Sequence, residues 1–283
     1  MKLGLSLAGG GVKGAAHIGV LKAFEEEGIK IDYISGTSSG SIVSTLYAIG
    51  YSADEIYKIF KKYSSDINYI SIMNIFKLIL GLIFKKKILI QGLNNGKSIE
   101  NLMKKLCEEK KISNINQIDM PLIIPSVDLH NGKIYFFSST KTRGTYNDNI
   151  EYINNINLAT AVHASCSYPG IFSPCKYQEK ELIDGGIREN IPWKALKNLG
   201  ADKVISVIFE ENIKNDDYIN IIEVIGKAIG ILSHELSNYE LVGADEIIRI
   251  RTNHISLLDN SKIDYLYKIG YKEGKKYLSK INL

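Results

Sequence analysis

The sequence predicts an α/β protein of three layers, in which helices cover both faces of a largely parallel central sheet. Short apolar runs alternate with longer helical patterns along the 283 residues, and the first two runs end directly in glycine-rich turns. The hydrophobic share of 45% is enough to build a sizeable core. Because no repeat, low-complexity run or linker interrupts the pattern, we expect one domain over residues 1–283, with a C-terminal helical part at 211–283.

The chain is mildly basic, with a net charge of +4 and an isoelectric point near 8.7. This charge is too weak and too dispersed to predict nucleic-acid binding, but it suits an acidic ligand or an anionic membrane surface. Three cysteines without the spacing of metal ligands indicate free thiols in a reducing compartment. The N-terminus reads as a strand and not as a signal peptide. We therefore expect a cytoplasmic protein, with peripheral membrane contact left open.

The first predicted strand, at residues 3–7, leads into a glycine-rich loop, Gly9-Gly10-Gly11-Val12-Lys13-Gly14, and then into a helix at 15–27. Dinucleotide-binding proteins share this order, and in them an acidic residue ends the second strand. Here Asp32 stands at the beginning of the second strand, at 31–34. The dinucleotide interpretation therefore fails at the position where the sequence can test it.

The same loop suits an ester hydrolase better. Successive glycines let backbone N–H groups point into a cleft in front of a helix N-terminus, which makes an anion-binding site. In acyl transfer such a site stabilises the oxyanion of the tetrahedral transition state. Gly9, Gly10 and Gly11 are the candidate donors. Lys13 has two interpretations, a positive charge near the site or a solvated lysine in the first helical turn.

The second strand ends in Gly36-Thr37-Ser38-Ser39-Gly40, a Gly-x-Ser-x-Gly sequence, and a helix is expected at 42–49. A serine on so sharp a turn takes a strained backbone conformation and exposes its hydroxyl group at the positive end of the helix. The two loops follow strands that would be neighbours, so both would open at the sheet edge where such folds bind ligands. The pattern also occurs in ordinary tight turns, so it does not by itself make Ser38 a nucleophile.

The middle of the chain continues the alternation. The turn His130-Asn131-Gly132 predicts a hairpin between two strands, and the polar stretch at 139–157 has no period and predicts a surface loop. The other expected helices are 53–63, 97–109 and 158–165, and the other expected strands are 121–129, 133–138, 181–184, 201–209 and 246–250.

Two amphipathic helices are expected near the C-terminus. The helix at 218–241 should turn its apolar residues inward, and the helix at 262–281 should turn a lysine-rich face to solvent. The residues expected inward on the first helix are Ile221, Ile225, Ile229 and Leu232.

The most apolar stretch lies at 69–84 and precedes three lysines, Lys85-Lys86-Lys87. Its polar residues recur at helical spacing, which predicts a helix with a wide apolar face. It is shorter than the ~20 residues of a membrane span and carries Asn74 and Lys77 inside, so a transmembrane helix is excluded. Two interpretations stay open for the segment 66–95: a helix packed against the core, or a lid or interfacial helix that contacts lipid.

Four motifs in order resemble the patatin-like phospholipase family. The match spans about residues 3–210, whereas 66–95 and the part after 210 match less clearly. The motifs are the glycine loop with His17-Ile18-Gly19-Val20-Leu21 after it, the turn around Ser38, Ala164-Ser165 with the proline-bounded 169–174, and Asp184-Gly185-Gly186 with Asn190 and Pro192.

The resemblance implies a serine acyl hydrolase that cleaves phospholipid or lysophospholipid esters through a Ser-Asp dyad, without a metal or cofactor. Ser38 would be the nucleophile and Asp184 the base, and a dry cleft would raise the pKa of Asp184 enough for that task. The reaction would pass through an acyl-enzyme. The oxyanion hole would be formed by Gly9, Gly10 and Gly11, and the supporting motif residues would be Gly14, Gly36, Gly40, Gly185 and Gly186.

Three alternatives remain open. A Ser-Asp-His esterase needs a histidine after Asp184, and only His234, on the polar side of its helix, and His254 stand there. A non-catalytic lipid- or acyl-binding protein would keep the fold, although the intact Ser38 and Asp184 oppose it. A nucleotide-binding enzyme would rest on the glycine loop alone. The residues expected to be structural are His17, His130, His163 and, as a packed thiol, Cys166.

Overall fold

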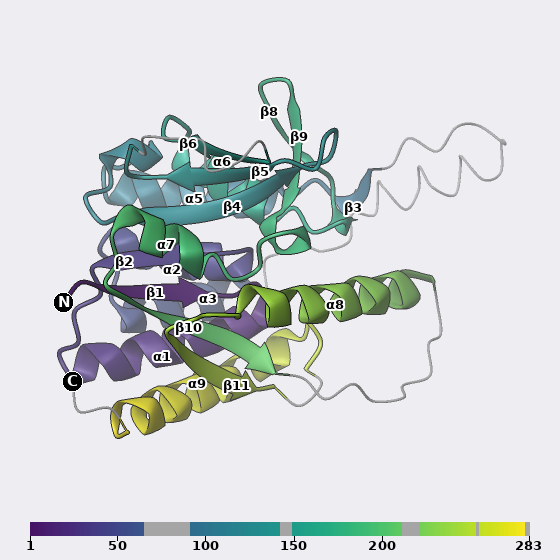
Figure 1. The fold of residues 1–283 in the computed structure, drawn as a ribbon. Helices are drawn as coiled ribbons and strands as arrows, with labels where there is room; N and C mark the ends of the chain where they lie inside the picture. The colour runs from purple at the N-terminus through teal and green to yellow at the C-terminus, as the bar shows by residue number, and fades with distance from the viewer. Residues whose placement is uncertain (65–90, 142–148, 211–220, 253–254, 281–283) are drawn as a thin grey trace, which may run out of the picture.

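A computed structural model describes residues 1–64, 91–141, 149–210, 221–252 and 255–280 (Figure 1). The predicted helix at 69–84 and most of the segment 66–95 therefore lie outside the described residues, as does His254. In the part of the chain that the structure describes, no helix combines the length and the apolar character needed to cross a membrane.

The described strands form a central sheet in the order β11-β10-β1-β2-β4-β5-β6, with β9 beside β4 and β8 beside β9. From β11 to β4 all neighbours are parallel, which confirms the largely parallel sheet. Two further strands, β3 (Gly92–Asn94) and β7 (Gly170–Phe172), pair separately. The strands of the sheet are β1 (Leu3–Leu7), β2 (Tyr33–Gly36), β4 (Leu122–Asp128), β5 (Ile134–Ser138), β6 (Ile150–Ile153), β8 (Cys175–Tyr177), β9 (Lys180–Asp184), β10 (Lys203–Glu210) and β11 (Glu246–Arg251).

Helices pack on both faces of the sheet, which confirms the three-layer α/β fold (Figure 1). Along β4, Leu122 and Ile124 point into one hydrophobic cluster, whereas Ile123 and Val127 point into the other, because successive side chains of a strand face opposite ways. The helices are α1 (Gly14–Glu26), α2 (Ser39–Ala48), α3 (Ala53–Ser64), α5 (Lys97–Glu109), α6 (Leu158–Ser165), α7 (Trp193–Leu199), α8 (Ile221–Glu240) and α9 (Ile263–Leu278).

The edge of β4 that carries β2 also carries β9, and this arrangement positions the candidate site. β5 pairs with one edge of β4 over Ile123 to Val127. On the other edge, β2 pairs with Leu122 and Ile123, and β9 pairs further along, with Asp184 opposite Ser126. Because β9 runs antiparallel, its last residue comes to lie just beyond the end of β2. The turn that carries Ser38 therefore lies near Asp184, although the two residues are 146 positions apart in the sequence.

The expected helices at 97–109 and 158–165 and the hairpin between β4 and β5 are confirmed. The predicted surface loop at 139–157 is wrong in its last part, because Ile150–Ile153 forms β6 and pairs with β5. Ile150 and Tyr152 pack against the smaller hydrophobic cluster and Ile153 against the larger one. The sequence around this short strand is rich in asparagine, which is typical of loops. The side chains on both faces of the strand are half-buried, so no alternation of buried and exposed residues marks it as a strand.

The long helix α8 is present, but its predicted orientation is wrong at Leu232. That side chain was expected inward, and it is 70% exposed, together with Val224 at 50% and Ile231 at 43%. Ile229 is half-buried. The prediction assumed that the polar side of an amphipathic helix faces solvent. In α8 the polar side, with Ser233, His234 and Ser237, faces a cavity of the protein instead.

Helices α1 and α9 approach each other closely through glycines. A Cβ atom at Gly270 would overlap the carbonyl oxygen of Ala16, and one at Gly19 would overlap the carbonyl oxygen of Tyr267. Because these obstacles are backbone atoms, a side chain can be accommodated only by moving the two helices apart.

We expect Gly270→Ala to lower the free energy of unfolding by about 1–3 kcal/mol through overpacking of this contact. Urea denaturation followed by circular dichroism measures the change. Gly226→Ala on α8 is the matched control, since no atom lies within 4 Å of the added Cβ, and helix propensity should raise its stability by about 0.5–1 kcal/mol. Equal stability of Gly270→Ala and the unchanged protein would contradict the close packing.

Candidate active site

Ser38 lies on the turn between β2 and α2 with φ of 52° and ψ of −122°. A non-glycine residue holds such a conformation only where its surroundings enforce it. The two flanking glycines are required, because a Cβ atom at Gly36 would overlap the carbonyl oxygen of Gly40, and one at Gly40 would overlap the carbonyl oxygen of Leu7. The turn therefore has the strained geometry that the sequence predicts.

Hydrogen bonds on both sides fix this turn. The backbone N–H of Ser38 donates to Oγ of Ser165 at 3.0 Å, and Oγ of Ser41 donates to the carbonyl oxygen of Ser38 at 2.6 Å. Helix α2 begins at the next residue, so the Ser38 side chain lies at its positive end. The Ser38 hydroxyl group is thus presented by a rigid backbone.

Asp184 ends β9 and is 2% exposed. Its Oδ1 accepts from the backbone N–H of Gly186 at 2.8 Å, and its own N–H donates to the carbonyl oxygen of Ser167 at 3.0 Å. Oδ2 is buried and has no hydrogen-bond partner among the described residues. Burial raises the pKa of Asp184 to about 6, although the nearby Ser38 hydroxyl group and the Gly186 amide favour the ionised form. The Ser38 hydroxyl group thus lies close enough to Asp184 to lower its pKa. Among the described residues, however, Oδ2 of Asp184 meets no group at hydrogen-bond geometry.

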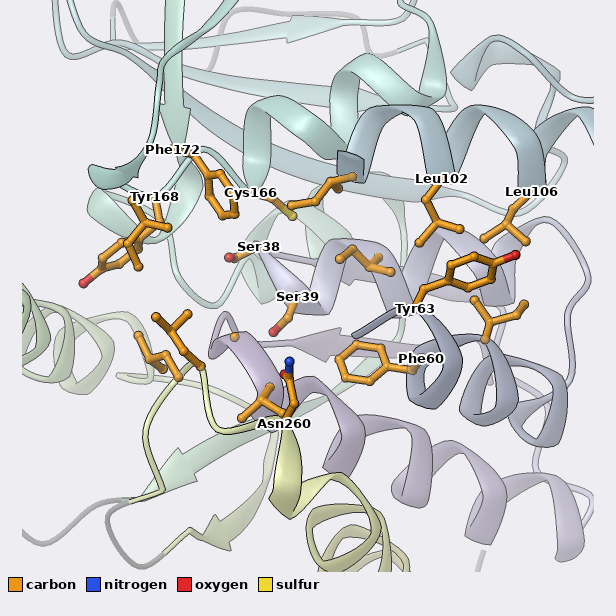
Figure 2. A pocket seen from close by; sticks show the side chains of 18 residues that line it. Ser38, Ser39, Phe60, Tyr63, Leu102, Leu106, Cys166, Tyr168, Phe172 and Asn260 are labelled. Carbon is orange, nitrogen blue, oxygen red and sulfur yellow. The ribbon is translucent and has the colours of Figure 1, made fainter. Parts of the chain in front are cut away.

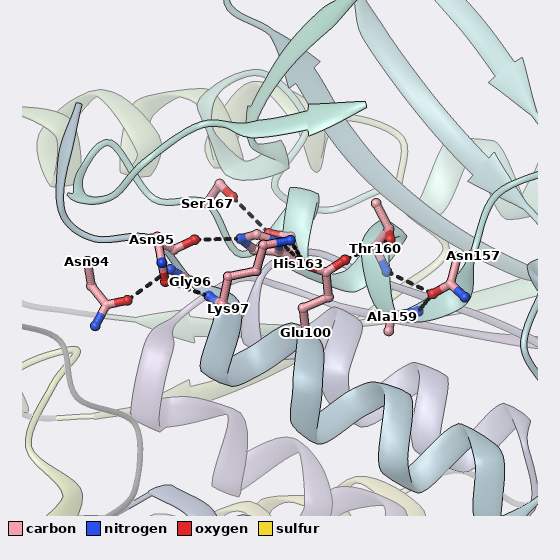
Figure 3. A network of polar contacts seen from close by, with 10 residues as sticks. All are labelled: Asn94, Asn95, Gly96, Lys97, Glu100, Asn157, Ala159, Thr160, His163 and Ser167. Atoms are coloured by element: carbon pink, nitrogen blue, oxygen red, sulfur yellow. Dashed lines mark hydrogen bonds and ion pairs between the residues drawn. The ribbon is translucent and has the colours of Figure 1, made fainter. Parts of the chain in front are cut away.

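Helix α6 supports both candidate residues from its C-terminal end, through Ser165 and Ser167. The helix is itself anchored to α5 through His163, as Figure 3 shows. Nδ1 of His163 lies 3.1 Å from Oε2 of Glu100, and Nε2 lies 3.1 Å from the carbonyl oxygen of Asn95. His163 is 3% exposed. This geometry agrees with the structural role expected for His163.

The three glycines of the first loop differ in the use of their amides. The N–H of Gly9 donates to Oδ1 of Asn190 at 2.9 Å, so it is already engaged. For the N–H groups of Gly10 and Gly11, no acceptor occurs in the described part of the chain. Gly11 has φ of 57°, and a Cβ atom at Gly10 would overlap the ring of Phe209. The amides of Gly10 and Gly11 are therefore the ones that can donate to a ligand.

Asn190 links the glycine loop to other parts of the site, a role that its motif alone does not reveal. Besides accepting from Gly9, its Nδ2 donates to Oγ of Ser237 at 2.9 Å. Its backbone N–H and that of Ile191 donate to the two carboxylate oxygens of Glu240, at 2.8 and 2.9 Å. These bonds connect the loop with the C-terminal half of α8.

The other motif glycines allow close backbone contacts around the site. A Cβ atom at Gly185 would overlap the carbonyl oxygen of Pro125, and one at Gly14 would lie 3.0 Å from Cβ of Ser39. Gly186 supplies the N–H that binds Asp184. The turn after β9 can therefore lie directly against β4, and the start of α1 directly against the start of α2, without side chains between them.

Two cavities meet at Ser38. The apolar cavity is lined by α2, α3 and α5, by residues between Cys166 and Phe172, and by residues between Leu257 and Asn260 (Figure 2). The polar cavity opens on the side of α8. Asp184 lines the polar cavity and not the apolar one. Ser38, Gly11, Tyr168 and Leu257 line both. Further residues of the apolar cavity are Ile42, Phe60, Ile99, Leu102, Leu106 and Phe172, and further residues of the polar cavity are Gly9, Gly10, Lys13, Gly186, Asn190, Gly230, Ser233, His234 and Ser237.

Lys13 and His234 are both part of the polar cavity. Lys13 is only 4% exposed, so the interpretation as a solvated lysine is wrong. Burial lowers the pKa of Lys13 to about 8. His234 lies on the polar side of α8, as expected, but this side faces the cavity. Among the described residues, no hydrogen bond joins His234 to Ser38 or Asp184.

The remaining candidates are packed inside the protein. His17 is fully buried, and its Nε2 lies 2.8 Å from the carbonyl oxygen of Ala8. Cys166 borders the apolar cavity, and burial raises the pKa of its thiol well above the ordinary value. A thiol of that kind stays protonated and is a poor nucleophile.

Comparison with known proteins supports the fold and the motifs. A model of patatin-like phospholipases matches residues 5–197. An uncharacterised protein of Acanthamoeba polyphaga mimivirus is 27% identical over 98% of this chain and 94% of its own length. Lysophospholipase NTE1 of Lodderomyces elongisporus is 30% identical over 72% of this chain, but this covers only 12% of its own length.

Solved structures share the architecture at low sequence identity. VipD from Legionella pneumophila aligns with a TM-score of 0.57 at 16% identity, over 99% of this chain and 67% of that one. The ExoU–SpcU complex from Pseudomonas aeruginosa aligns with a TM-score of 0.50 at 17% identity, over 99% of this chain and 51% of the other. At this identity the likeness concerns the fold.

Proposed function

This chain belongs to the patatin-like phospholipase family, and we propose that it is a serine acyl hydrolase that cleaves phospholipid or lysophospholipid esters with a Ser38–Asp184 dyad. The observation that carries the proposal is the convergence of three features on one point. A strained serine, a buried carboxylate and two glycine amides all line the polar cavity, next to the point where the apolar cavity joins it. Among the described residues, neither Oδ2 of the carboxylate nor the two amides has a hydrogen-bond partner.

In the first step Oδ2 of Asp184 accepts the proton of Ser38 while Oγ attacks the ester carbonyl carbon. Burial favours this transfer because it raises the pKa of Asp184 to about 6 and so makes its carboxylate a stronger base. The amides of Gly10 and Gly11 stabilise the negative charge that develops on the carbonyl oxygen. Neither amide reorganises for this, since neither has another acceptor among the described residues.

In the second step the tetrahedral intermediate collapses to an acyl-enzyme. Asp184 returns the proton to the leaving alkoxide, so the alcohol departs neutral. A water molecule from the polar cavity then repeats the sequence, because Asp184 can remove its proton as it did that of Ser38. The products are a fatty acid and an alcohol, and Ser38 regains its proton.

The apolar cavity is the proposed site of the acyl chain. Its wall consists mainly of aliphatic and aromatic side chains of α2, α3 and α5, such as Ile42, Phe60 and Leu102. Transfer of a hydrocarbon chain from water into such surroundings is favourable by roughly 0.8 kcal/mol per buried CH₂ group. The lysophospholipases among the relatives support a lipid ester as substrate.

We also propose that residues 1–283 act as one domain and that the protein contacts membranes only peripherally.

A fluorophosphonate probe tests the proposal directly, because it forms a covalent bond only with an activated serine. We expect labelling of the unchanged protein at Ser38, located by mass spectrometry, and none in Ser38→Ala. Ser44→Ala is the control, since Ser44 is buried on the same helix and bonds within it, to the carbonyl oxygen of Ser41 at 3.2 Å. An unlabelled Ser38 in the folded protein would favour a lipid-binding protein without catalysis.

The rival mechanism is a Ser-Asp-His triad, and the position of His234 in the polar cavity is the observation that favours it. In a triad the histidine separates the serine from the acid. Here the Ser38 hydroxyl group lies close enough to Asp184 to lower the pKa of its carboxyl group, and among the described residues His234 is hydrogen-bonded to neither of them, which supports the dyad. A loss of probe labelling in His234→Ala as complete as in Ser38→Ala would favour the triad instead.

A further inference from the structure

The chemistry of acyl transfer decides which cavity receives which half of the ester. The base that removes the serine proton must return it to the leaving oxygen, so the leaving alcohol lies beside the base. Ser38 borders both cavities, whereas Asp184 borders only the polar one. In the proposed reaction the polar cavity therefore holds the alcohol, and the wall of that cavity selects among alcohols.

Helix α8 supplies that wall with an unusual distribution of residues. Ser233, His234 and Ser237 face the polar cavity, while Leu232 and Ile231 are exposed on other sides of the helix. An amphipathic helix normally buries its apolar side. The polar side of α8 instead faces a site in which a polar ligand can use it.

The position of this wall relative to the reacting atoms is fixed. Ser237 binds Nδ2 of Asn190, whose Oδ1 binds the amide of Gly9. The carboxylate of Glu240 binds the backbone N–H groups of Asn190 and Ile191, and Nε1 of Trp193 donates to the carbonyl oxygen of Glu240 at 2.7 Å. His234 therefore has a defined place in the cavity, one helical turn from Ser237.

One ring nitrogen of His234, Nε2, has no partner in the part of the chain that the structure describes. Nδ2 of Asn238 lies 3.5 Å from Nδ1 and can only donate, so Nδ1 accepts and the ring proton of a neutral imidazole is on Nε2. The carboxylate of Glu235 also lies on the side of Nδ1, at 3.8 Å. Nε2 carries the ring hydrogen, which makes it a donor.

The lining of the polar cavity therefore includes a basic residue, Lys13, and a ring N–H donor, Nε2 of His234. The acidic side chain among its lining residues is Asp184, whose task is the proton transfer. A neutral glycerol as leaving alcohol has no charge for these groups to bind. A leaving alcohol that contains a phosphodiester carries a negative charge, which these groups can bind.

We propose that His234 is a specificity-determining residue that binds the phosphate of the leaving alcohol and so favours lysophospholipids over neutral monoacylglycerols. This rests on the proposed function. His234 takes no part in the proton transfers, and Nε2–H donates to a phosphate oxygen across the polar cavity from Ser38.

Two substrates with the same acyl chain test the inference, a lysophosphatidylcholine and a monoacylglycerol, both below their micellar concentrations. In His234→Ala we expect KM for the lysophospholipid to rise about tenfold, as for the loss of one hydrogen bond to a charged group, with kcat little changed. The preference for the lysophospholipid, as the ratio of the two kcat/KM values, should fall by a similar factor. His234→Lys should restore most of the preference, because its ammonium group can donate to the phosphate.

Leu232→Ser is the control, since Leu232 is exposed on the same helix, and it should keep the ratio of the unchanged protein. An unaltered ratio in His234→Ala would overturn the inference and leave the proposed function intact. An equal collapse of kcat for both substrates would also overturn it, because His234 would then be a catalytic residue. An unchanged protein that hydrolyses neither substrate would contradict the proposed function itself.

Discussion

Ser38→Ala is expected to abolish ester hydrolysis, with kcat falling by about 10⁵-fold or more. The reason is that the neighbouring nucleophilic side chains among the described residues are poor substitutes: Ser39 is part of α2, and burial keeps the thiol of Cys166 protonated. Release of fatty acid from a lysophospholipid, or hydrolysis of a chromogenic ester, measures the effect. The variant should remain folded, because the larger serine side chain already tolerates the φ of 52° and alanine is no larger.

A burst experiment sharpens this prediction. The unchanged protein should release one equivalent of alcohol rapidly if acylation outpaces deacylation, and Ser38→Ala should release none. Ser44→Ala provides the matched comparison, because it removes a buried hydroxyl group from the same helix outside both cavities. Residual hydrolysis in Ser38→Ala at the level of Ser44→Ala would exclude Ser38 as the nucleophile.

The local parts of the candidate site could be predicted from the sequence because their causes are local. The strained turn at Ser38 requires glycines at positions 36 and 40, which are only four positions apart in the sequence. The glycine loop after β1 is likewise a property of six consecutive residues. Sequence patterns of this kind constrain the backbone directly.

The non-local parts could not be predicted in the same way. The amide of Gly9 is bound by Asn190, 181 positions away. Of the three glycines in the loop, therefore, only Gly10 and Gly11 have amides without an acceptor among the described residues. Asp184 reaches Ser38 only because β9 pairs antiparallel with β4 beside the end of β2. The family resemblance names Asp184, but the residues alone carry no signal of this pairing.

The predicted orientation of α8 is wrong for a different physical reason. Hydrophobic periodicity predicts which residues share a side of a helix, but not which side faces the protein. The usual rule predicts burial of Leu232, but that side chain is exposed, and Ser233, His234 and Ser237 face inward, toward the polar cavity. A helix that violates the rule beside a cavity is itself an indication of a binding surface.

Asp184→Asn is expected to lower kcat by about 10³- to 10⁴-fold, because an amide cannot accept the proton of Ser38. The effect on stability should have the opposite sign. The folded-state pKa of about 6 lies above the usual value of 3.8, so the contribution of Asp184 to stability is greatest at low pH and is lost as the pH rises through 6. At pH 8 the asparagine variant should therefore be at least as stable as the unchanged protein, and lost activity cannot be ascribed to unfolding.

The pH dependence of kcat/KM connects this loss with the base. Only the ionised form of Asp184 can accept a proton, so kcat/KM of the unchanged protein should fall about tenfold per pH unit below an apparent pKa near 6. Asp184→Glu, which keeps a carboxylate, should retain part of the activity and an acidic limb, while the residual activity of Asp184→Asn should show no limb at that pH. An asparagine variant with the same acidic limb and substantial activity would assign the base to another residue, and His234 would be the first to examine because it borders the same cavity.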